Sequence, residues 1–138
     1  MKHYKIGYTQ GTYDTLHYGH INLLKHAKER CEILYVGVNS DRLVKEYKYK
    51  EPIIKEKERL DIVKAIRYVD DAFIVDTLDK LVTLDKIKFD AIFIGDDWKG
   101  NDRWKKTEQD LSKLGVDVVF LPHTDGISSS IIKEKLNK

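Results

Sequence analysis

Five short runs of apolar residues are spaced along the chain, and each has the length of a strand rather than that of a helix. Apolar runs of about four to eight residues that are rich in Val, Ile, Tyr and Phe are typical of strands buried in a parallel sheet. The sequence therefore predicts strands over residues 4–10, 33–38, 72–75, 91–94 and 116–121.

Most of the stretches that follow these runs repeat apolar residues every three or four positions, which is the period of an amphipathic helix. In the first of them, Ile21, Leu24, Ala27 and Cys31 share one stripe. The pattern predicts helices over 19–31, 56–69, 79–87, 103–114 and 127–136. It also predicts a polar, Lys-rich loop over about 40–54 and a turn over 122–126.

Strands that alternate with helices through short connections predict an α/β fold, with a parallel sheet covered by helices on both faces. We expect a doubly wound, five-stranded, Rossmann-like sheet, and a single domain over residues 1–138 because no repeat or linker interrupts the alternation. Ligands of such sheets bind beyond the carboxyl ends of the strands. Functional residues are therefore expected in the segments 10–20, 39–52, 95–104 and 122–130.

The composition is that of a soluble globular protein. Of the 138 residues, 41% are apolar and 35% are charged, and the formal net charge is only +2, so bulk charge indicates neither nucleic acid nor a membrane as partner. No segment approaches the roughly 18 apolar residues of a membrane span, and we expect no leader and a cytoplasmic location. The one cysteine, Cys31, is expected to be a buried thiol at the end of the first helix.

The strongest chemical signal is the run from Gly11 to His20, which joins the first predicted strand to the first predicted helix. Free N–H groups and the dipole at a helix start favour anions, and the imidazoles of His17 and His20, on either side of Gly19, can donate charge-assisted hydrogen bonds to a phosphoryl group. Asp14 is well placed to brace the loop. The alternatives are two ordinary polar histidines near a turn, or a zinc site that needs further ligands.

The run G-T-Y-D-T-L-H-Y-G-H resembles the HxGH signature of the nucleotidyltransferase superfamily. Three further stretches narrow the resemblance to glycerol-3-phosphate cytidylyltransferases. The segment I-R-Y-V-D at 66–70 matches theirs, G-D-D-W-K-G at 95–100 resembles G-D-D-W-E-G, and H-T-D-G-I-S-S-S at 123–130 resembles R-T-E-G-I-S-T-T. The four motifs keep the family's order and extend over nearly the whole chain.

The resemblance implies an enzyme that transfers CMP from CTP, with Mg²⁺ accompanying the triphosphate, to a small polyol phosphate. Glycerol 3-phosphate is the first candidate acceptor, and the implied product is CDP-glycerol for teichoic acid or capsule synthesis. The implied reaction is an in-line attack of the acceptor phosphate on the α-phosphorus, without a covalent intermediate or a dedicated protein metal site, in a homodimer. The alternatives are a cytidylyltransferase for another alcohol phosphate, an adenylyltransferase, and a nucleotide-binding module without turnover.

The resemblance also implies roles for individual residues. The implied catalytic residues are His17, His20, Lys48 and Arg67. The implied nucleotide-binding residues are Thr12, Tyr13, Asp14, Gly19, Asp97, Gly126, Ile127, Ser128, Ser129 and Ser130. The implied substrate-binding residues are Lys48, Lys50, Arg67 and Trp98.

Two of these assignments concern basic residues and have structural alternatives. Lys48 and Lys50 also fit a solvated loop, although a loop of this length is a candidate lid that closes on substrate. Arg67, late in a predicted helix, also fits a salt bridge with Asp70 or Asp71, or a dimer contact.

The remaining alternatives concern turns and helix ends. Asp97 could hold Mg²⁺, accept from the cytosine amino group or brace a turn, and Trp98 could wall the site or pack in the core. The serines at 128–130 could bind phosphates or cap a helix. Arg59 matches another family arginine, and its role is left open. His123 stands where the family usually has an arginine, so we expect the triphosphate to be held differently.

Overall fold

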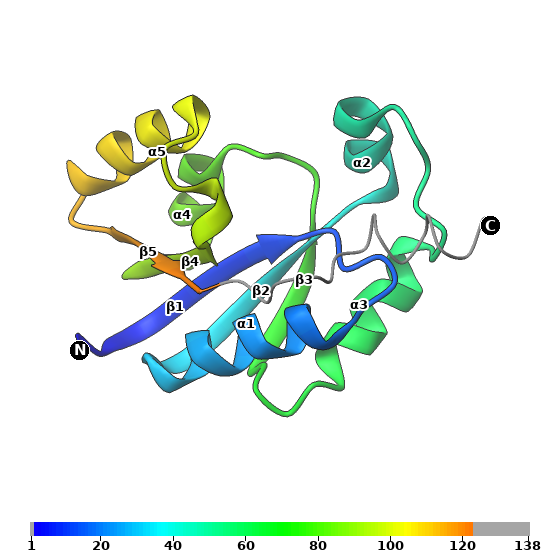
Figure 1. Cartoon of the computed structure of the whole chain (residues 1–138), viewed down its shortest axis with the longest axis horizontal. Coiled ribbons are helices and arrows are strands. Elements are labelled where there is room, and N and C mark those ends of the chain that lie inside the picture. The colour runs from blue at the N-terminus through cyan, green and yellow to red at the C-terminus, as the bar shows by residue number, and fades with distance from the viewer. Residues whose placement is uncertain (1, 123–138) are drawn as a thin grey trace.

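The structure is a computed structural model that describes residues 2–122. It contains the predicted five-stranded parallel sheet, in the order β3-β2-β1-β4-β5 (Figure 1). The strands are β1 (Tyr4–Gly11), β2 (Cys31–Asn39), β3 (Asp71–Val75), β4 (Ala91–Gly95) and β5 (Asp117–Leu121). The helices are α1 (Tyr18–Glu29), α2 (Asp41–Lys48), α3 (Glu56–Lys64), α4 (Lys80–Ile87), the short 3₁₀ helix η1 (Asp96–Trp98) and α5 (Asp102–Ser112).

Helices cover both faces of the sheet, as the alternation predicts. Helices α1 and α3 lie on one face, while α4 and α5 lie on the other (Figure 1). Each face has its own apolar core: Leu24 and Val63 belong to the first, and Trp104 and Leu111 to the second. Two cores on opposite faces make the fold doubly wound, so the sheet itself is the buried middle layer.

The strand order places the carboxyl end of β1 at the point where the direction of winding reverses. From β1 the chain passes to β2 and β3 on one side, and it then returns to β4 and β5 on the other. Ligands of open α/β sheets bind at such a switch point. The segment that follows β1 and the segment that follows β4 are therefore neighbours at one edge of the sheet.

The largest departure from the predicted elements is α2, which occupies much of the stretch that was predicted to be a polar loop. The hydroxyl of Ser40 accepts a hydrogen bond from the backbone N–H of Leu43 and so caps the helix. Leu43 and Val44 are buried, and Tyr49 ends the helix in the left-handed conformation. Only two residues of α2 are buried, so its apolar periodicity is weak. Five lysines between positions 45 and 57 made the stretch look like a polar loop instead of a helix.

Two other boundaries differ from the prediction. Helix α1 ends at Glu29, and Cys31 begins β2 instead, because its backbone pairs with Tyr4 of β1. The thiol is buried as predicted, and burial raises its pKa to about 11. Helix α3 ends at Lys64 rather than at residue 69, so Arg67 lies in the connection to β3 and not in a helix.

A close approach between β1 and β2 requires glycine at position 37. The side chain of Tyr8 is fully buried and crosses over β2, where a Cβ on Gly37 would meet the Tyr8 hydroxyl. That hydroxyl donates a 2.7 Å hydrogen bond to Oε1 of Gln10. Gly37 therefore leaves room for the Tyr8 side chain, whose hydroxyl reaches Gln10 near the end of β1.

No helix within the described residues 2–122 is long and apolar enough to cross a membrane.

Candidate active site

Two imidazoles form the start of α1, directly after the loop that leaves β1. His17 is the N-cap residue, and its Nδ1 accepts a 3.0 Å hydrogen bond from the backbone N–H of Gly19. The backbone N–H of His17 in turn donates to Nδ1 of His20 at 3.1 Å. The ring centroids of the two imidazoles are 4.0 Å apart. The two histidines thus close the helix end as a reciprocal pair.

The hydrogen bonds determine which nitrogen of each ring carries the proton. A neutral imidazole has one donor nitrogen and one acceptor nitrogen, and Nδ1 is the acceptor in both His17 and His20. The proton therefore lies on Nε2 in each ring, and both Nε2–H groups remain available as donors. Two side-chain N–H donors at a helix start, where the dipole favours negative charge, form an arrangement that suits phosphate oxygens.

The pKa values of both imidazoles are lowered, which favours the neutral form of each ring at pH 7. A hydrogen bond from a neutral ring to an ionised phosphate is still charge-assisted, because the acceptor carries the charge. Burial lowers the pKa of His17 below its usual value. Burial, the neighbouring His17 and the positive charge of Lys48 together lower the pKa of His20 to about 4. The protein alone therefore presents neutral N–H donors, and the nearby positive charge comes from lysine.

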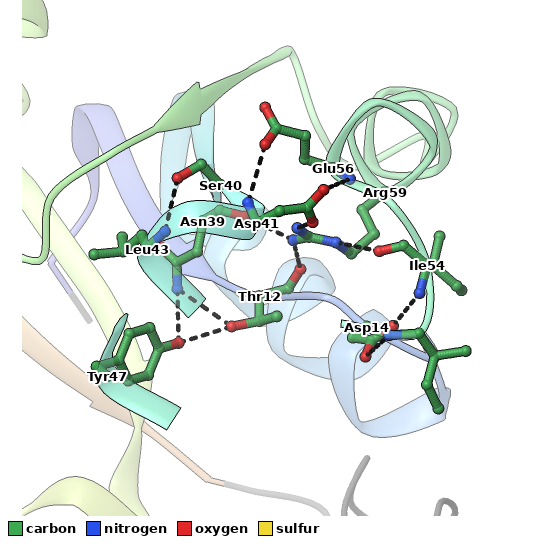
Figure 2. A network of polar contacts seen from close by, with 11 residues as sticks. Thr12, Asp14, Asn39, Ser40, Asp41, Leu43, Tyr47, Ile54, Glu56 and Arg59 are labelled. Atoms are coloured by element: carbon green, nitrogen blue, oxygen red, sulfur yellow. Dashed lines mark hydrogen bonds and ion pairs between the residues drawn. The ribbon is translucent and has the colours of Figure 1, made fainter. Parts of the chain in front are cut away.

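The loop between β1 and α1 is held from the side of residues 53–54. The carboxylate of Asp14 accepts hydrogen bonds of 2.9 Å from the backbone N–H groups of both Ile53 and Ile54, and it is buried (Figure 2). Asp14 therefore braces the loop, as predicted. Tyr13 and Thr15 both have a positive φ, of 55° and 54°, which non-glycine residues rarely adopt.

Arg59 ties three segments together beneath this loop. Its side chain is fully buried, and its guanidinium donates to the carbonyls of Thr12 and Asn39 at 2.7 Å each and to that of Ile54 at 2.8 Å (Figure 2). It also forms an ion pair of 2.7 Å with Asp41. Arg59 is thus committed to protein acceptors and organises the site from within.

The structure brings Lys48, but not Lys50, into the described interactions of the imidazoles. Lys48 is the last residue of α2, and its charge acts on His20. Its Nζ lies 5.7 Å from the centroid of the Tyr47 ring. Lys50 is exposed in the bend that follows the helix.

Arg67 lies in the segment that leads into β3, at the amino end of that strand, and the structure does not bring it together with His17 and His20. Its guanidinium lies 5.0 Å from the centroid of the Tyr68 ring and donates to the Tyr68 hydroxyl at 2.9 Å. The carboxylate of Asp70 pairs with Lys28 at 2.6 Å instead of with Arg67.

Two predicted residues follow β4 at the switch point. Asp97 and Trp98 lie in η1, and both are exposed. The guanidinium of Arg103 lies 5.8 Å from the centroid of the Trp98 ring, so this tryptophan is a surface residue and not part of either core. The predicted residues His123, Gly126, Ile127, Ser128, Ser129 and Ser130 lie outside the described residues.

Sequence reasoning missed three residues that shape the site. Asn39 and Tyr47 contact Thr12, and Asp41 binds the buried Arg59. The available signal was position: Asn39 ends a strand of the sheet, and Asp41 follows it by two residues. Nothing in the local sequence distinguished Tyr47 from the other tyrosines.

A doubly wound parallel sheet with two imidazole donors at its switch point fits the class of nucleotidyltransferases, and the family model and the curated relatives show that the chain is one. The cytidylyltransferase-like family model matches residues 8–135 of the chain. The chain belongs to this family.

The chain is similar to relatives with more than one named activity and to a solved structure. The chain is 34% identical to the glycerol-3-phosphate cytidylyltransferase of Staphylococcus aureus (strain NCTC 8325 / PS 47), over 93% of this chain and 92% of that protein. It is 39% identical to the FAD synthase of Pyrococcus abyssi (strain GE5 / Orsay), over 82% of this chain and 77% of that protein. The crystal structure of the lipopolysaccharide core biosynthesis protein from Thermoplasma volcanium GSS1 superposes with a TM-score of 0.76 and 28% identity, over 88% of this chain and 99% of that chain.

Proposed function

We propose that the protein transfers CMP from CTP to the phosphate of a small polyol phosphate, glycerol 3-phosphate first, and releases pyrophosphate. The observation that carries the proposal is the pair of Nε2–H groups of His17 and His20 at the start of α1. The similarity to glycerol-3-phosphate cytidylyltransferases over 93% of the chain supports CTP as the donor and glycerol 3-phosphate as the acceptor.

The proposed reaction is an in-line displacement at phosphorus. An oxygen of the acceptor phosphate forms a bond to the α-phosphorus of CTP, and the bond from that phosphorus to the bridging oxygen of the leaving pyrophosphate breaks. The attacking phosphate is already ionised, so the reaction needs no protein base and no covalent intermediate. Positioning and stabilisation of charge on the transferred group are what the site must supply.

His17 and His20 are proposed to donate from Nε2 to oxygens of the α-phosphate. A neutral donor suits this role, since it gives up no proton in the ground state but strengthens its hydrogen bond as charge develops on the transferred group. Lys48 supplies the positive charge beside them. Lys50, Asp97 and Trp98 are proposed contacts to the acceptor and nucleotide.

Mg²⁺ is proposed to accompany the triphosphate. Its proposed ligands are the phosphates of CTP. Within residues 2–122, no three or more His, Cys, Asp or Glu side chains are grouped so that they could hold a metal ion. When bound, Mg²⁺ supplies neutralisation of the leaving pyrophosphate. The serine-bearing segment at 128–130 is proposed to hold the β- and γ-phosphates, with His123 in place of the usual arginine.

A second candidate is adenylyl transfer. It is favoured by the 39% identity to an FAD synthase, which is higher than the identity to the cytidylyltransferases although it covers less of the chain. Transfer of CMP to another alcohol phosphate is the third candidate. A homodimer with the 66–70 segment at its interface, and a product destined for teichoic acid or capsule, complete the proposal.

The test combines each nucleoside triphosphate with each candidate acceptor. The purified protein is incubated with Mg²⁺, each of the four nucleoside triphosphates and a panel of acceptors, and pyrophosphate release is measured. We expect release with CTP and glycerol 3-phosphate, and phosphorus NMR should then identify CDP-glycerol. Release only with ATP would replace the proposal by adenylyl transfer. If every combination is silent while CTP still binds, the protein is a nucleotide-binding module.

A further inference from the structure

The hydroxyl of Tyr47, in the last turn of α2, contacts the loop that follows β1. Its oxygen lies 2.9 Å from Oγ1 of Thr12 and accepts a 3.1 Å hydrogen bond from Nδ2 of Asn39 (Figure 2). The same Nδ2 donates to Oγ1 of Thr12 at 3.3 Å. Two hydroxyls and one amide thus form a closed triangle between α2, the loop that follows β1, and the end of β2.

The orientation of the Asn39 amide follows from its other contact. Oδ1 of Asn39 accepts a 2.9 Å hydrogen bond from Nε2 of Gln10, and Oε1 of Gln10 accepts from the buried Tyr8 hydroxyl. Nε2 of Gln10 also donates to the carbonyl of Thr77. With both amides oriented by this chain of hydrogen bonds, the Asn39 N–H groups must face the two hydroxyls.

A proton count then bears on the direction of the hydrogen bond between Thr12 and Tyr47. Only one proton can lie between the two oxygens, so the other hydroxyl proton points elsewhere. A phenol is more acidic than an aliphatic alcohol and is the better donor, whereas the threonine oxygen is the better acceptor. Either hydroxyl can donate in this 2.9 Å contact, and the acidity of the phenol favours Tyr47 as the donor, which leaves the Thr12 proton for another acceptor.

We propose that Tyr47 is a positioning residue of the active site: it donates to Oγ1 of Thr12, turns the Thr12 hydroxyl into a donor for a nucleotide phosphate oxygen, and ties the helix end that carries Lys48 to the loop. This inference rests on the proposed function, in which Thr12 and Lys48 contact phosphates.

The neighbouring residues hold the backbone of the loop, whereas Tyr47 contacts the hydroxyl of Thr12. The carbonyl of Thr12 is already held by Arg59, so the backbone of the loop is fixed without the tyrosine. The Thr12 side chain has its hydrogen bonds with Asn39 and Tyr47. Lys48 is adjacent to Tyr47 in sequence, and its charge acts on His20. Loss of the Tyr47 hydroxyl should therefore alter donor geometry and lysine position without unfolding the loop.

The first test compares Tyr47→Phe with Tyr49→Phe, which removes the same atom two residues away from an exposed side chain. We expect Tyr47→Phe to lower kcat/KM for CTP about tenfold, equivalent to ~1.4 kcal/mol, and Tyr49→Phe to leave it unchanged. Equal kinetics in both variants would overturn the proposal. A lower melting temperature of Tyr47→Phe with unchanged kinetics would do the same, because it would reveal a purely structural role.

The second test asks whether Tyr47 acts through Thr12. Thr12→Val keeps the shape of the side chain but removes its hydroxyl. If Tyr47 acts by orienting that hydroxyl, Tyr47→Phe should cost clearly less in the Thr12→Val background than in the wild type. A full and additive loss in the double variant would show that the two residues act independently, contrary to the proposal.

The third test needs no turnover and separates this inference from the proposed function. Hydrogen exchange of the α2 amides, residues 41–48, should be faster in Tyr47→Phe than in the wild type and unaltered in Tyr49→Phe. Unaltered exchange in Tyr47→Phe would contradict the proposal that the Tyr47 hydroxyl ties α2 to the loop. If the wild type shows no nucleotide-dependent pyrophosphate release, the proposed function fails, and the exchange result still decides whether Tyr47 holds α2.

Discussion

Arg59 donates a 2.7 Å hydrogen bond to the carbonyl of Thr12, a residue 47 positions earlier in the chain. The contact joins the start of α3 to the loop that leaves β1. Because the same guanidinium also holds the end of β2 and the segment before α3, one buried cation fixes the relative positions of the segments around the site.

Replacement of the Arg59 guanidinium by an uncharged side chain should lower the free energy of unfolding substantially. Arg59→Met leaves the Asp41 carboxylate without its partner and three backbone carbonyls without their donor, and we expect a loss of roughly 3–5 kcal/mol in the free energy of unfolding. Arg42→Met is the matched control, since Arg42 is exposed and pairs with Glu46 on the surface. The control should cost about 1 kcal/mol or less, and urea denaturation measures both. A similar loss in the two variants would contradict the organising role of Arg59.

Substitution of the imidazoles should separate turnover from folding. His17→Asn keeps an oxygen near the position of Nδ1, so the cap to Gly19 survives, but the Nε2–H donor is gone. We expect turnover to fall by about 10²–10³, as for the loss of an oxyanion-hole donor, with the melting temperature nearly unchanged. His20→Ala should show the same loss of turnover.

His26→Ala is the control for both histidine variants, because His26 is on the exposed side of α1 and pairs only with Glu29 in the described contacts. Full activity of this control is expected. Retained activity in His17→Asn or His20→Ala would remove that residue from the mechanism.

The free energy of unfolding should depend on pH through His20. Its folded pKa of about 4 lies below the ordinary value of 6.5, so the unfolded chain binds more protons between these two values. Stability is therefore fully present above pH 6.5 and is lost as the pH falls toward 4, by at most roughly 3 kcal/mol for this group. In His20→Gln, which cannot titrate, this slope should be shallower in urea denaturation between pH 4 and 7. Identical slopes would show that His20 is not held neutral by the fold.

A methyl group at position 37 should collide with Tyr8. Gly37→Ala places a Cβ against the Tyr8 hydroxyl, and we expect a loss of about 1–3 kcal/mol, as in overpacked cores. Tyr8→Phe removes the atom that clashes, so the double variant should lose less than the sum of the single losses. Thermal unfolding of the four proteins completes the cycle, and strict additivity would argue against the contact.

The sheet was predictable because its signal is local. Each of the five strands is a short apolar run bounded by polar residues, and alternation with helices implied parallel pairing. The position of His17 and His20 at the start of α1 followed from the same pattern. Helix α2 was not predictable in this way, because its stability comes from a serine cap and two buried side chains.

The role of the buried Arg59 could not be predicted from the sequence, for a different reason. Arg59 lies among lysines and glutamates that are solvated, and only tertiary contacts with Thr12 and Asn39 distinguish it. The neutral state of the imidazoles likewise depends on burial and on Lys48, which is distant in the sequence. Arg67 precedes β3, at the amino end of that strand, and its predicted part in the site stays a prediction.

The left-handed backbone at Tyr13 and Thr15 has a consequence for the portability of the motif. Such conformations cost of order 1–3 kcal/mol each in a side-chain-bearing residue, so an isolated peptide of this sequence would not adopt them. The hydrogen bonds of Asp14 to residues 53–54 help to hold the loop in this shape. Grafting residues 11–20 onto another parallel sheet would therefore transfer the amino-acid sequence of the motif but not its backbone conformation. The graft would also need a segment that binds Asp14 as residues 53–54 do.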